Sequence, residues 1–178
     1  EVTALIRHAK TEGNLKKKYI GITDEPIING TRADKKYPEA DIVISSPMMR
    51  CIETAELIYP GIKPKIYDGL AETNFGKFEN RSYDDLKDDP LYKEWLASSG
   101  TLPFPGGESS EAFRKRCVEA YNKAVSDHPG KRLAFVVHGG TIMAVMSYIF
   151  GGGFYDYHTD NLCGFEFEQG EGTYKRIK

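Results

Sequence analysis

Two short apolar segments, each ending in a histidine and then in small or polar residues, constrain the fold more than any other feature of the sequence. The first covers residues 2–6 and is followed by Arg7 and His8. The second covers residues 133–137, within a strand expected at 131–137, and is followed by His138. Short apolar runs of this kind are typical of buried strands. Because open α/β sheets place ligands beyond the carboxyl ends of their strands, the two segments predict two imidazoles at one site.

Strand patterns alternate with helix patterns along much of the chain. Further strands are expected at residues 41–45 and 65–67, and helices at residues 46–58, 109–127 and 141–150. Ser46 and Pro47 are expected to open the first of these helices, as cap and first-turn residue. This alternation is typical of a parallel sheet covered by helices. We therefore predict an α/β three-layer sandwich with a mostly parallel central sheet flanked by helices.

Two segments depart from the alternation. Residues 73–108 are rich in aromatic side chains and are expected to form an inserted lid over the sheet edge, with short helices at residues 82–87 and 90–98. Residues 163–177 include an alternating run and a glycine-containing turn, which predict a C-terminal hairpin. The length of 178 residues suits one domain with a sizeable core. Residues 1–178 are therefore expected to form a single domain.

Charge, hydropathy and cysteine content argue against several classes of protein. A net charge of −2 provides no overall basic field for nucleic acid. No segment approaches the ~20 apolar residues of a membrane span, and no secretory leader pattern is visible. Cys51, Cys117 and Cys163 are widely spaced and match neither a disulfide framework nor a zinc site. A cytoplasmic location is the resulting expectation.

The polar residues near the two histidines meet the needs of phosphoryl transfer. A phosphomonoester is a dianion, so its cleavage requires cations, a nucleophile and an acid for the leaving oxygen. Arg7 and Arg50 offer planar guanidinium groups that match phosphate oxygens. Neutral His8 can attack phosphorus, and His138 can steady the transferred oxygens. Glu72 follows the third predicted strand and is the best-placed carboxylate for a general acid.

Other chemistries find weaker support in the sequence. Asp156, His158 and Asp160 alternate, but they lie in a glycine- and tyrosine-rich loop without the usual spacing of metal ligands. The phosphate-binding loop of nucleotide hydrolases and the elbow of serine hydrolases are both absent. Each candidate also has an ordinary structural interpretation when taken alone. A strand-end histidine is often a partly buried polar residue, and Arg50 suits a surface salt bridge.

Taken together and in this order, the motifs resemble those of the histidine phosphatase (phosphoglycerate mutase-like) superfamily. The main matching segments are Arg7-His8-Ala9 with Thr11, Glu12 and Asn14; Ser45-Ser46-Pro47 with Arg50, Thr54 and Ala55; Leu70, Glu72, Phe75-Gly76 and Phe78-Glu79; and Val137-His138-Gly139-Gly140. The segments that fit its smaller phosphatases are Gly21-Ile22-Thr23-Asp24 and Pro105-Gly106-Gly107-Glu108-Ser109. The resemblance runs through nearly the whole chain, and within that branch it looks most like the α-ribazole phosphatases of cobalamin assembly.

This resemblance implies a phosphomonoesterase that needs neither metal nor organic cofactor and acts through a phosphohistidine. It implies His8 as nucleophile and Glu72 as proton donor. The residues expected to bind phosphate or substrate are Arg7, Asn14, Ile20, Gly21, Arg50, His138 and Gly139. The expected partner is a small phosphomonoester, with α-ribazole 5′-phosphate as one candidate, and the chain is expected to be a monomer or homodimer.

Two other functions stay open. The family's mutases carry an adjacent arginine pair in the insertion, whereas Arg81 is the one arginine between Gly76 and Glu108, which favours a phosphatase. A catalytically silent module that binds phosphorylated ligands is the second alternative. Against it, all the matched catalytic positions are occupied by the family's residue types.

Three segments carry further expectations. Ala9 and Lys10 stand where the family usually has glycine and an acid, and the charge of Lys10 is expected to lower the pKa of His8. Residues 30–39 are expected to form at most a short helix. The aromatic residues expected to face a substrate with a ring or an apolar body are Tyr19, Phe75, Phe78 and Trp95. Packing of these rings on one another is the alternative for each.

Overall fold

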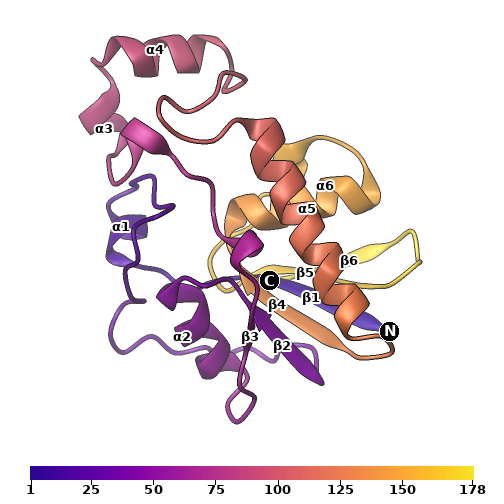
Figure 1. Ribbon diagram of the computed structural model, residues 1–178. Coiled ribbons are helices and arrows are strands. Elements are labelled where there is room, and N and C mark those ends of the chain that lie inside the picture. Colours follow the sequence, from indigo (N-terminus) through magenta and orange to yellow (C-terminus); the bar gives the residue numbers. More distant parts are fainter.

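The computed structural model describes residues 1–178 and contains a six-stranded mixed sheet flanked by helices (Figure 1). The strands are β1 (Val2–Arg7), β2 (Ile42–Ser45), β3 (Lys65–Ile66), β4 (Leu133–Val137), β5 (Gly164–Glu168) and β6 (Tyr174–Ile177). The α-helices are α1 (Glu12–Leu15), α2 (Met49–Ile58), α3 (Tyr83–Leu86), α4 (Pro90–Ala97), α5 (Ser110–Asp127) and α6 (Gly139–Phe150). Short 3-10 helices are η1 (Asp68–Leu70), η2 (Gly76–Phe78) and η3 (Phe154–Tyr157). The predicted α/β fold is confirmed.

The strand order β3-β2-β4-β1-β5-β6 places the two strand–histidine segments next to each other. β1 and β4 are parallel, and Arg7 pairs with Val137 at the end of their ladder. The His8 amide then donates to the Val137 carbonyl over 3.0 Å. His8 and His138 therefore leave the same edge of the sheet at the same level. β5 and β6 form the expected antiparallel hairpin beside β1.

The central strands bury alternate side chains on opposite faces of the sheet. Ala4 and Ile6 of β1 belong to one apolar cluster with Cys51 of α2. Leu5, which points the other way, belongs to a second cluster with Ile142 of α6. Because successive side chains of a strand alternate, both faces need a helical cover. α2 covers one face and α5 with α6 covers the other, which gives three layers (Figure 1).

Some predicted element boundaries are wrong. α2 begins at Met49 instead of Ser46, and Met48 is its N-cap without a side-chain hydrogen bond. The Ser46 hydroxyl accepts from the Met48 amide and also contacts His138, so this side chain serves the sheet edge and not the helix end. α6 begins at Gly139, two residues before the predicted start. Residues 30–39 contain no helix.

The segment 73–108 has a small aromatic core of its own. The predicted short helices appear as α3 and α4, which project beyond the sheet on the side where α1 lies (Figure 1). Phe78, Leu86, Tyr92 and Trp95 are buried against one another. Phe78 is therefore a core residue of this segment, and the expectation that it faces a substrate is wrong.

None of the helices combines the length and the apolar composition that a membrane-spanning helix requires.

Candidate active site

His8 directly follows β1 and is only 4% exposed. Its Nδ1 atom lies 2.7 Å from the carbonyl oxygen of Ala9. Because a carbonyl oxygen only accepts, this contact assigns the ring proton to Nδ1 and leaves the Nε2 lone pair free. Burial and the nearby charge of Arg50, with a smaller effect of Arg7, lower the pKa of His8 to about 3, although the Ala9 carbonyl opposes this shift. The ring is therefore neutral at neutral pH.

The two unusual residues after His8 have different surroundings. Ala9 is fully buried, and its amide donates to the Thr54 hydroxyl over 2.9 Å. Its backbone is not among the positive-φ positions of the chain, so the extra methyl group brings no left-handed strain. Lys10 is exposed and contributes nothing to the pKa of His8. The expectation that Lys10 lowers this pKa is wrong, because buried Arg50 is the dominant neighbouring charge.

His138 lies beside His8 at the end of β4 and is completely buried. The two rings meet edge to face, with centroids 5.3 Å apart. The Nε2 atom of His138 is 2.7 Å from the Ser46 hydroxyl, with which it shares a hydrogen bond. Burial lowers the pKa of His138 well below its ordinary value, and Arg50, His8 and Arg7 lower it further. Two neutral imidazoles therefore occupy this edge.

Arg50 is fully buried in the first turn of α2, so its interpretation as a surface salt-bridge residue is wrong. Its terminal nitrogens donate to three carbonyls of one loop, those of Thr23 at 2.6 Å, Gly21 at 2.9 Å and Ile20 at 3.4 Å. Ile20 and Gly21, both predicted to bind substrate, thus position Arg50 through their carbonyl oxygens.

The two arginines share an unusual feature. Nη1 of Arg7 donates to the Thr159 carbonyl over 2.9 Å. The Nε atoms of Arg7 and Arg50 are both buried and have no hydrogen-bond partner. A buried donor without a partner costs about 1–3 kcal/mol, and more for a charged group. An acceptor oxygen of a bound anion is the kind of partner that each of these donors lacks.

Glu72 lies between η1 and the aromatic segment. One carboxylate oxygen accepts from the Thr73 amide at 2.8 Å, and the other accepts from the Gly140 amide at 3.2 Å. The carboxylate therefore sits at the N-terminus of α6, where the helix dipole favours negative charge. A Cβ atom at Gly140 would overlap the Glu72 carboxylate, and one at Gly139 would lie 3.4 Å from Nε of Arg7. The absence of a side chain at Gly140 and Gly139 therefore lets Glu72 and Arg7 lie close to the start of α6.

Asn14, another predicted binding residue, has a different set of contacts. Its side-chain oxygen accepts from the Thr11 amide at 3.1 Å, which completes the capping box of α1. The same oxygen accepts from Asn161 at 3.3 Å, and Asn161 also donates to the His8 carbonyl at 2.9 Å. Asn14 is thereby connected to the backbone of His8.

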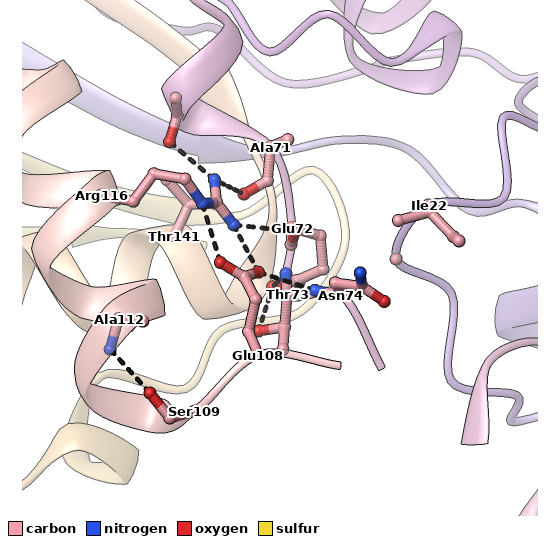
Figure 2. Close-up of polar contacts among 12 residues, drawn as sticks. Ile22, Ala71, Glu72, Thr73, Asn74, Glu108, Ser109, Ala112, Arg116 and Thr141 are labelled. Carbon is pink, nitrogen blue, oxygen red and sulfur yellow. Dashed lines mark hydrogen bonds and ion pairs between the residues drawn. The ribbon is translucent and has the colours of Figure 1, made fainter. Parts of the chain in front are cut away.

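Several positioning groups were not identified as such from the sequence. The Glu79 carboxylate accepts from the amides of Gly21, Ile22 and Thr23 and from the Thr23 hydroxyl. It therefore fixes the loop that holds Arg50. Figure 2 shows a second such group, Arg116, between a carboxylate and the backbone that carries Glu72. The position of Glu79 inside a matched motif was a sequence signal for a role at the site. Arg116 had no such signal, because it lies in an ordinary amphipathic helix.

A cavity of about 220 Å³ opens next to Glu72. Most of its wall is aromatic: Tyr19, Phe75, Trp95, Phe104, Phe113, Phe154 and Tyr155. No lysine, arginine or histidine lines it. Three of the four aromatic residues expected to face a substrate line this cavity, and Phe78 does not.

No group of three or more histidine, cysteine or acidic side chains is placed to hold a metal ion. Asp156, one member of the alternating acidic and histidine run, instead accepts from the Gly153 amide over 2.8 Å. That contact belongs to the start of η3.

Comparison with known proteins connects this geometry with a family. The model of the histidine phosphatase superfamily (branch 1) matches residues 3–177. The uncharacterized phosphatase PhoE of Bacillus subtilis is 30% identical over 155 residues, which cover 83% of this chain and 77% of that protein.

Solved structures agree with the family match. A putative α-ribazole-5′-P phosphatase from Escherichia coli superposes with a TM-score of 0.82 at 21% identity, covering 98% of this chain and 93% of its own. A phosphoglycerate mutase from Thermus thermophilus gives a TM-score of 0.75 at 26% identity, covering 100% and 99% of the two chains. Family model, sequence relative and fold coincide, and the chain belongs to the histidine phosphatase superfamily.

Proposed function

We propose that this protein is a phosphomonoesterase that hydrolyses small phosphorylated metabolites through a phosphohistidine at His8, without a metal ion. One observation carries the proposal: Arg7 and Arg50 have unpaired, buried Nε donors, and the charges of both act on a neutral imidazole, His8, whose Nε2 lone pair is free. Cationic donors beside a neutral nucleophile are what the transfer of a phosphoryl dianion requires.

In the first step, Nε2 of His8 attacks phosphorus while the bond from phosphorus to the ester oxygen breaks. A phosphate dianion bound beside Glu72 favours the protonated form of its carboxyl group, which gives its proton to the departing oxygen, and the alcohol leaves. Arg7, Arg50 and His138 hold the transferred oxygens as their charge is redistributed. The hydrogen bond from Nδ1 of His8 to the Ala9 carbonyl stabilises the ring as it becomes positively charged.

In the second step, water attacks the phosphohistidine. Glu72, now ionised, takes a proton from this water, and the bond between phosphorus and Nε2 breaks. Inorganic phosphate leaves, and both His8 and Glu72 return to their starting protonation states. Glu72 thus acts as general acid in the first half-reaction and as general base in the second.

The cavity beside Glu72 supports a substrate whose alcohol part is a ring or an apolar body. Aromatic walls offer stacking surface, and the absence of cationic lining residues disfavours alcohols that carry a carboxylate. We include α-ribazole 5′-phosphate as the first candidate substrate. A phosphoglycerate mutase is the less favoured alternative, because Arg81 lies away from this cavity and donates to the carbonyls of Lys77 and Asp85.

The test is phosphate release from p-nitrophenyl phosphate in EDTA, for the wild type, His8→Ala and the matched control His128→Ala at the end of α5. We expect the wild type and the control to be equally active and His8→Ala to lose about a thousandfold or more. Rapid alkaline quenching should trap a phosphoenzyme that is stable in alkali and is lost when the sample is then acidified.

Four results would contradict the proposal. Activity that survives in His8→Ala would rule out this nucleophile, and activity abolished by EDTA would rule out a metal-free reaction. A wild type that is inert on this substrate, on α-ribazole 5′-phosphate and on sugar phosphates would favour a silent binding module. Exchange between phosphoglycerates faster than phosphate release would favour a mutase.

A further inference from the structure

Arg116 of α5 uses all five of its side-chain N–H donors. Two bonds from Nη1 go to the carbonyls of Gly69 at 2.8 Å and Ala71 at 2.9 Å. Nη2 donates to the Glu72 carbonyl at 3.2 Å and to the Glu108 carboxylate at 2.8 Å, and Nε donates to the other Glu108 oxygen at 3.0 Å. A guanidinium group has five N–H donors, so none is left for a phosphate oxygen. Arg116 therefore differs from Arg7 and Arg50, whose Nε atoms are unpaired.

Glu108 completes the arrangement from the other side. Its carboxylate accepts from the Asn74 amide at 2.8 Å, and the Asn74 carbonyl accepts from the Glu108 amide at 3.0 Å. Burial raises the pKa of Glu108, but the hydrogen bonds from Arg116 and from the Asn74 amide outweigh it and hold this pKa below its ordinary value. The pair is thus ionised at neutral pH and holds the chain on both sides of Glu72 (Figure 2).

The position of the Glu72 carboxyl group depends on these contacts. The segment 71–74 is not part of a helix or strand, so no regular ladder fixes its backbone. Its fixed points are the carbonyls of Ala71 and Glu72, held by Arg116, and the Asn74 amide, held by Glu108. Just before this segment, the Thr141 hydroxyl donates to the Leu70 carbonyl at 3.0 Å.

We propose that the Arg116–Glu108 pair is a positioning device that sets where Glu72 presents its proton to the leaving oxygen. The inference rests on the proposed function, in which Glu72 is the general acid. Its consequence is specific for the first half-reaction: loosening the pair should slow phosphoryl transfers that need a proton at the leaving oxygen and should spare transfers that do not.

Two aryl phosphates of nearly the same shape separate these cases. Phenolate is a poor leaving group and needs the acid, whereas p-nitrophenolate leaves well without it. The ratio kcat/KM reports the first half-reaction, in which Glu72 acts as acid, whereas kcat also includes the second, in which Glu72 acts as base whatever the substrate. General acid catalysis contributes about 10²–10⁴-fold, so Glu72→Gln should lose far more kcat/KM on phenyl phosphate than on p-nitrophenyl phosphate. We expect Arg116→Lys, which keeps the charge but loses the planar set of donors, to lose about tenfold or more of kcat/KM on phenyl phosphate alone.

The matched control is Arg132→Lys. Arg132 makes a similar set of carboxylate contacts with Glu39 and Asp41, and we expect its replacement to change neither substrate's kcat/KM. Glu108→Gln removes the charge of the pair from the other side and should reproduce the leaving-group dependence of Arg116→Lys. It also supplies the test if Arg116→Lys does not fold.

The double variant Arg116→Lys, Glu72→Gln decides between positioning and general stability. If Arg116 acts through Glu72, then adding Arg116→Lys to Glu72→Gln should cause no further loss of activity on phenyl phosphate. Equal losses on the two substrates, or additive losses in the double variant, would overturn the inference and leave the proposed function intact. If Glu72→Gln itself shows no leaving-group dependence, the assignment of Glu72 as acid is wrong and the inference is wrong with it.

Discussion

The imidazole rings of His8 and His138 lie edge to face at a centroid distance of 5.3 Å, with their planes at 68°. They reach this arrangement because β1 and β4 are adjacent and parallel, and because their last paired residues lie level with each other. Both rings are buried near Arg50, whose charge helps to lower the pKa of each. The ends of β1 and β4 therefore place both imidazoles in a buried position near a positive charge, and this position keeps them neutral.

The first prediction concerns stability against pH. The pKa of His8 is about 3 in the folded protein, mainly because the ring is buried and close to Arg50, against an ordinary value of 6.5. Below pH 6.5 the unfolded chain therefore binds a proton that the folded protein does not. The free energy of unfolding should fall as the pH drops from 6.5 towards 3, by up to ~1.4 kcal/mol per pH unit for this group. His138 adds a contribution of the same sign.

Urea denaturation between about pH 7 and pH 5 measures this dependence through the linkage between proton binding and stability. His8→Gln should show a shallower loss of stability with falling pH than the wild type. Identical slopes for the two proteins would contradict the neutral assignment of His8.

The second prediction concerns Thr54, whose hydroxyl accepts from the Ala9 amide at 2.9 Å and donates to the Arg50 carbonyl at 2.7 Å. Thr54→Val keeps the shape but leaves the buried Ala9 amide unpaired, which should cost about 1–3 kcal/mol of unfolding free energy. It should also lower kcat, because the hydroxyl holds Ala9, whose carbonyl oxygen orients the His8 ring. Thr54→Ser retains the hydroxyl and should keep kcat close to that of the wild type. A fully active, equally stable valine variant would refute this role.

The third prediction separates stability from activity at Gly140. Gly140→Ala places a methyl group where the Glu72 carboxylate lies, so the carboxylate must move. We expect about a tenfold or greater loss of kcat on phenyl phosphate. Alanine favours a helix over glycine by up to about 1 kcal/mol, so thermal unfolding should change little. Gly172→Ala, where nothing lies within 4 Å, is the control, and equal activity of the two variants would contradict the placement of Glu72.

The fourth prediction concerns Glu79, which fixes the loop whose carbonyls hold Arg50. Glu79→Gln weakens hydrogen bonds to a charged acceptor, each worth about 1.5–3 kcal/mol, and should let the loop and Arg50 shift. We expect weaker competitive inhibition by inorganic phosphate, with Ki raised several-fold or more. The control is Asp85→Asn, which weakens the N-terminal cap of α3 within the same segment 73–108. It should leave the Ki for inorganic phosphate unchanged. An unaltered Ki in Glu79→Gln would show that this loop does not control the phosphate site.

Several features were predictable from the sequence because they depend on local pattern. Apolar runs that end in His8 and His138 identified two neighbouring strands, and the alternation of elements predicted the layered α/β fold. The motif order identified the family, which the match over residues 3–177 confirms. Glu72 and Arg50 were candidates for the same reason. The structure places Arg50 where its charge acts on both histidines, and it places the Glu72 carboxylate on the Gly140 amide, two residues after His138. Their catalytic roles stay predictions.

Tertiary contacts decided what local pattern did not encode. Ser46 does not begin α2, because its hydroxyl hydrogen-bonds with His138, 92 positions away. Phe78 packs inside the aromatic segment, while Phe75 lines the cavity, although both belong to one motif. Lys10 adjoins His8 in sequence but is exposed, so its charge does not lower the ring's pKa.

The sequence by itself determined which chemical groups the protein has and which strands deliver them to the sheet edge, because strand periodicity and motif order are properties of neighbouring residues. Only the tertiary structure decided which of those groups are neutral, which arginine donors are unpaired, and which arginine is fully used. Burial and hydrogen-bond partners depend on segments far apart in the chain, as the contacts of Arg116 with Gly69 and Glu72 show.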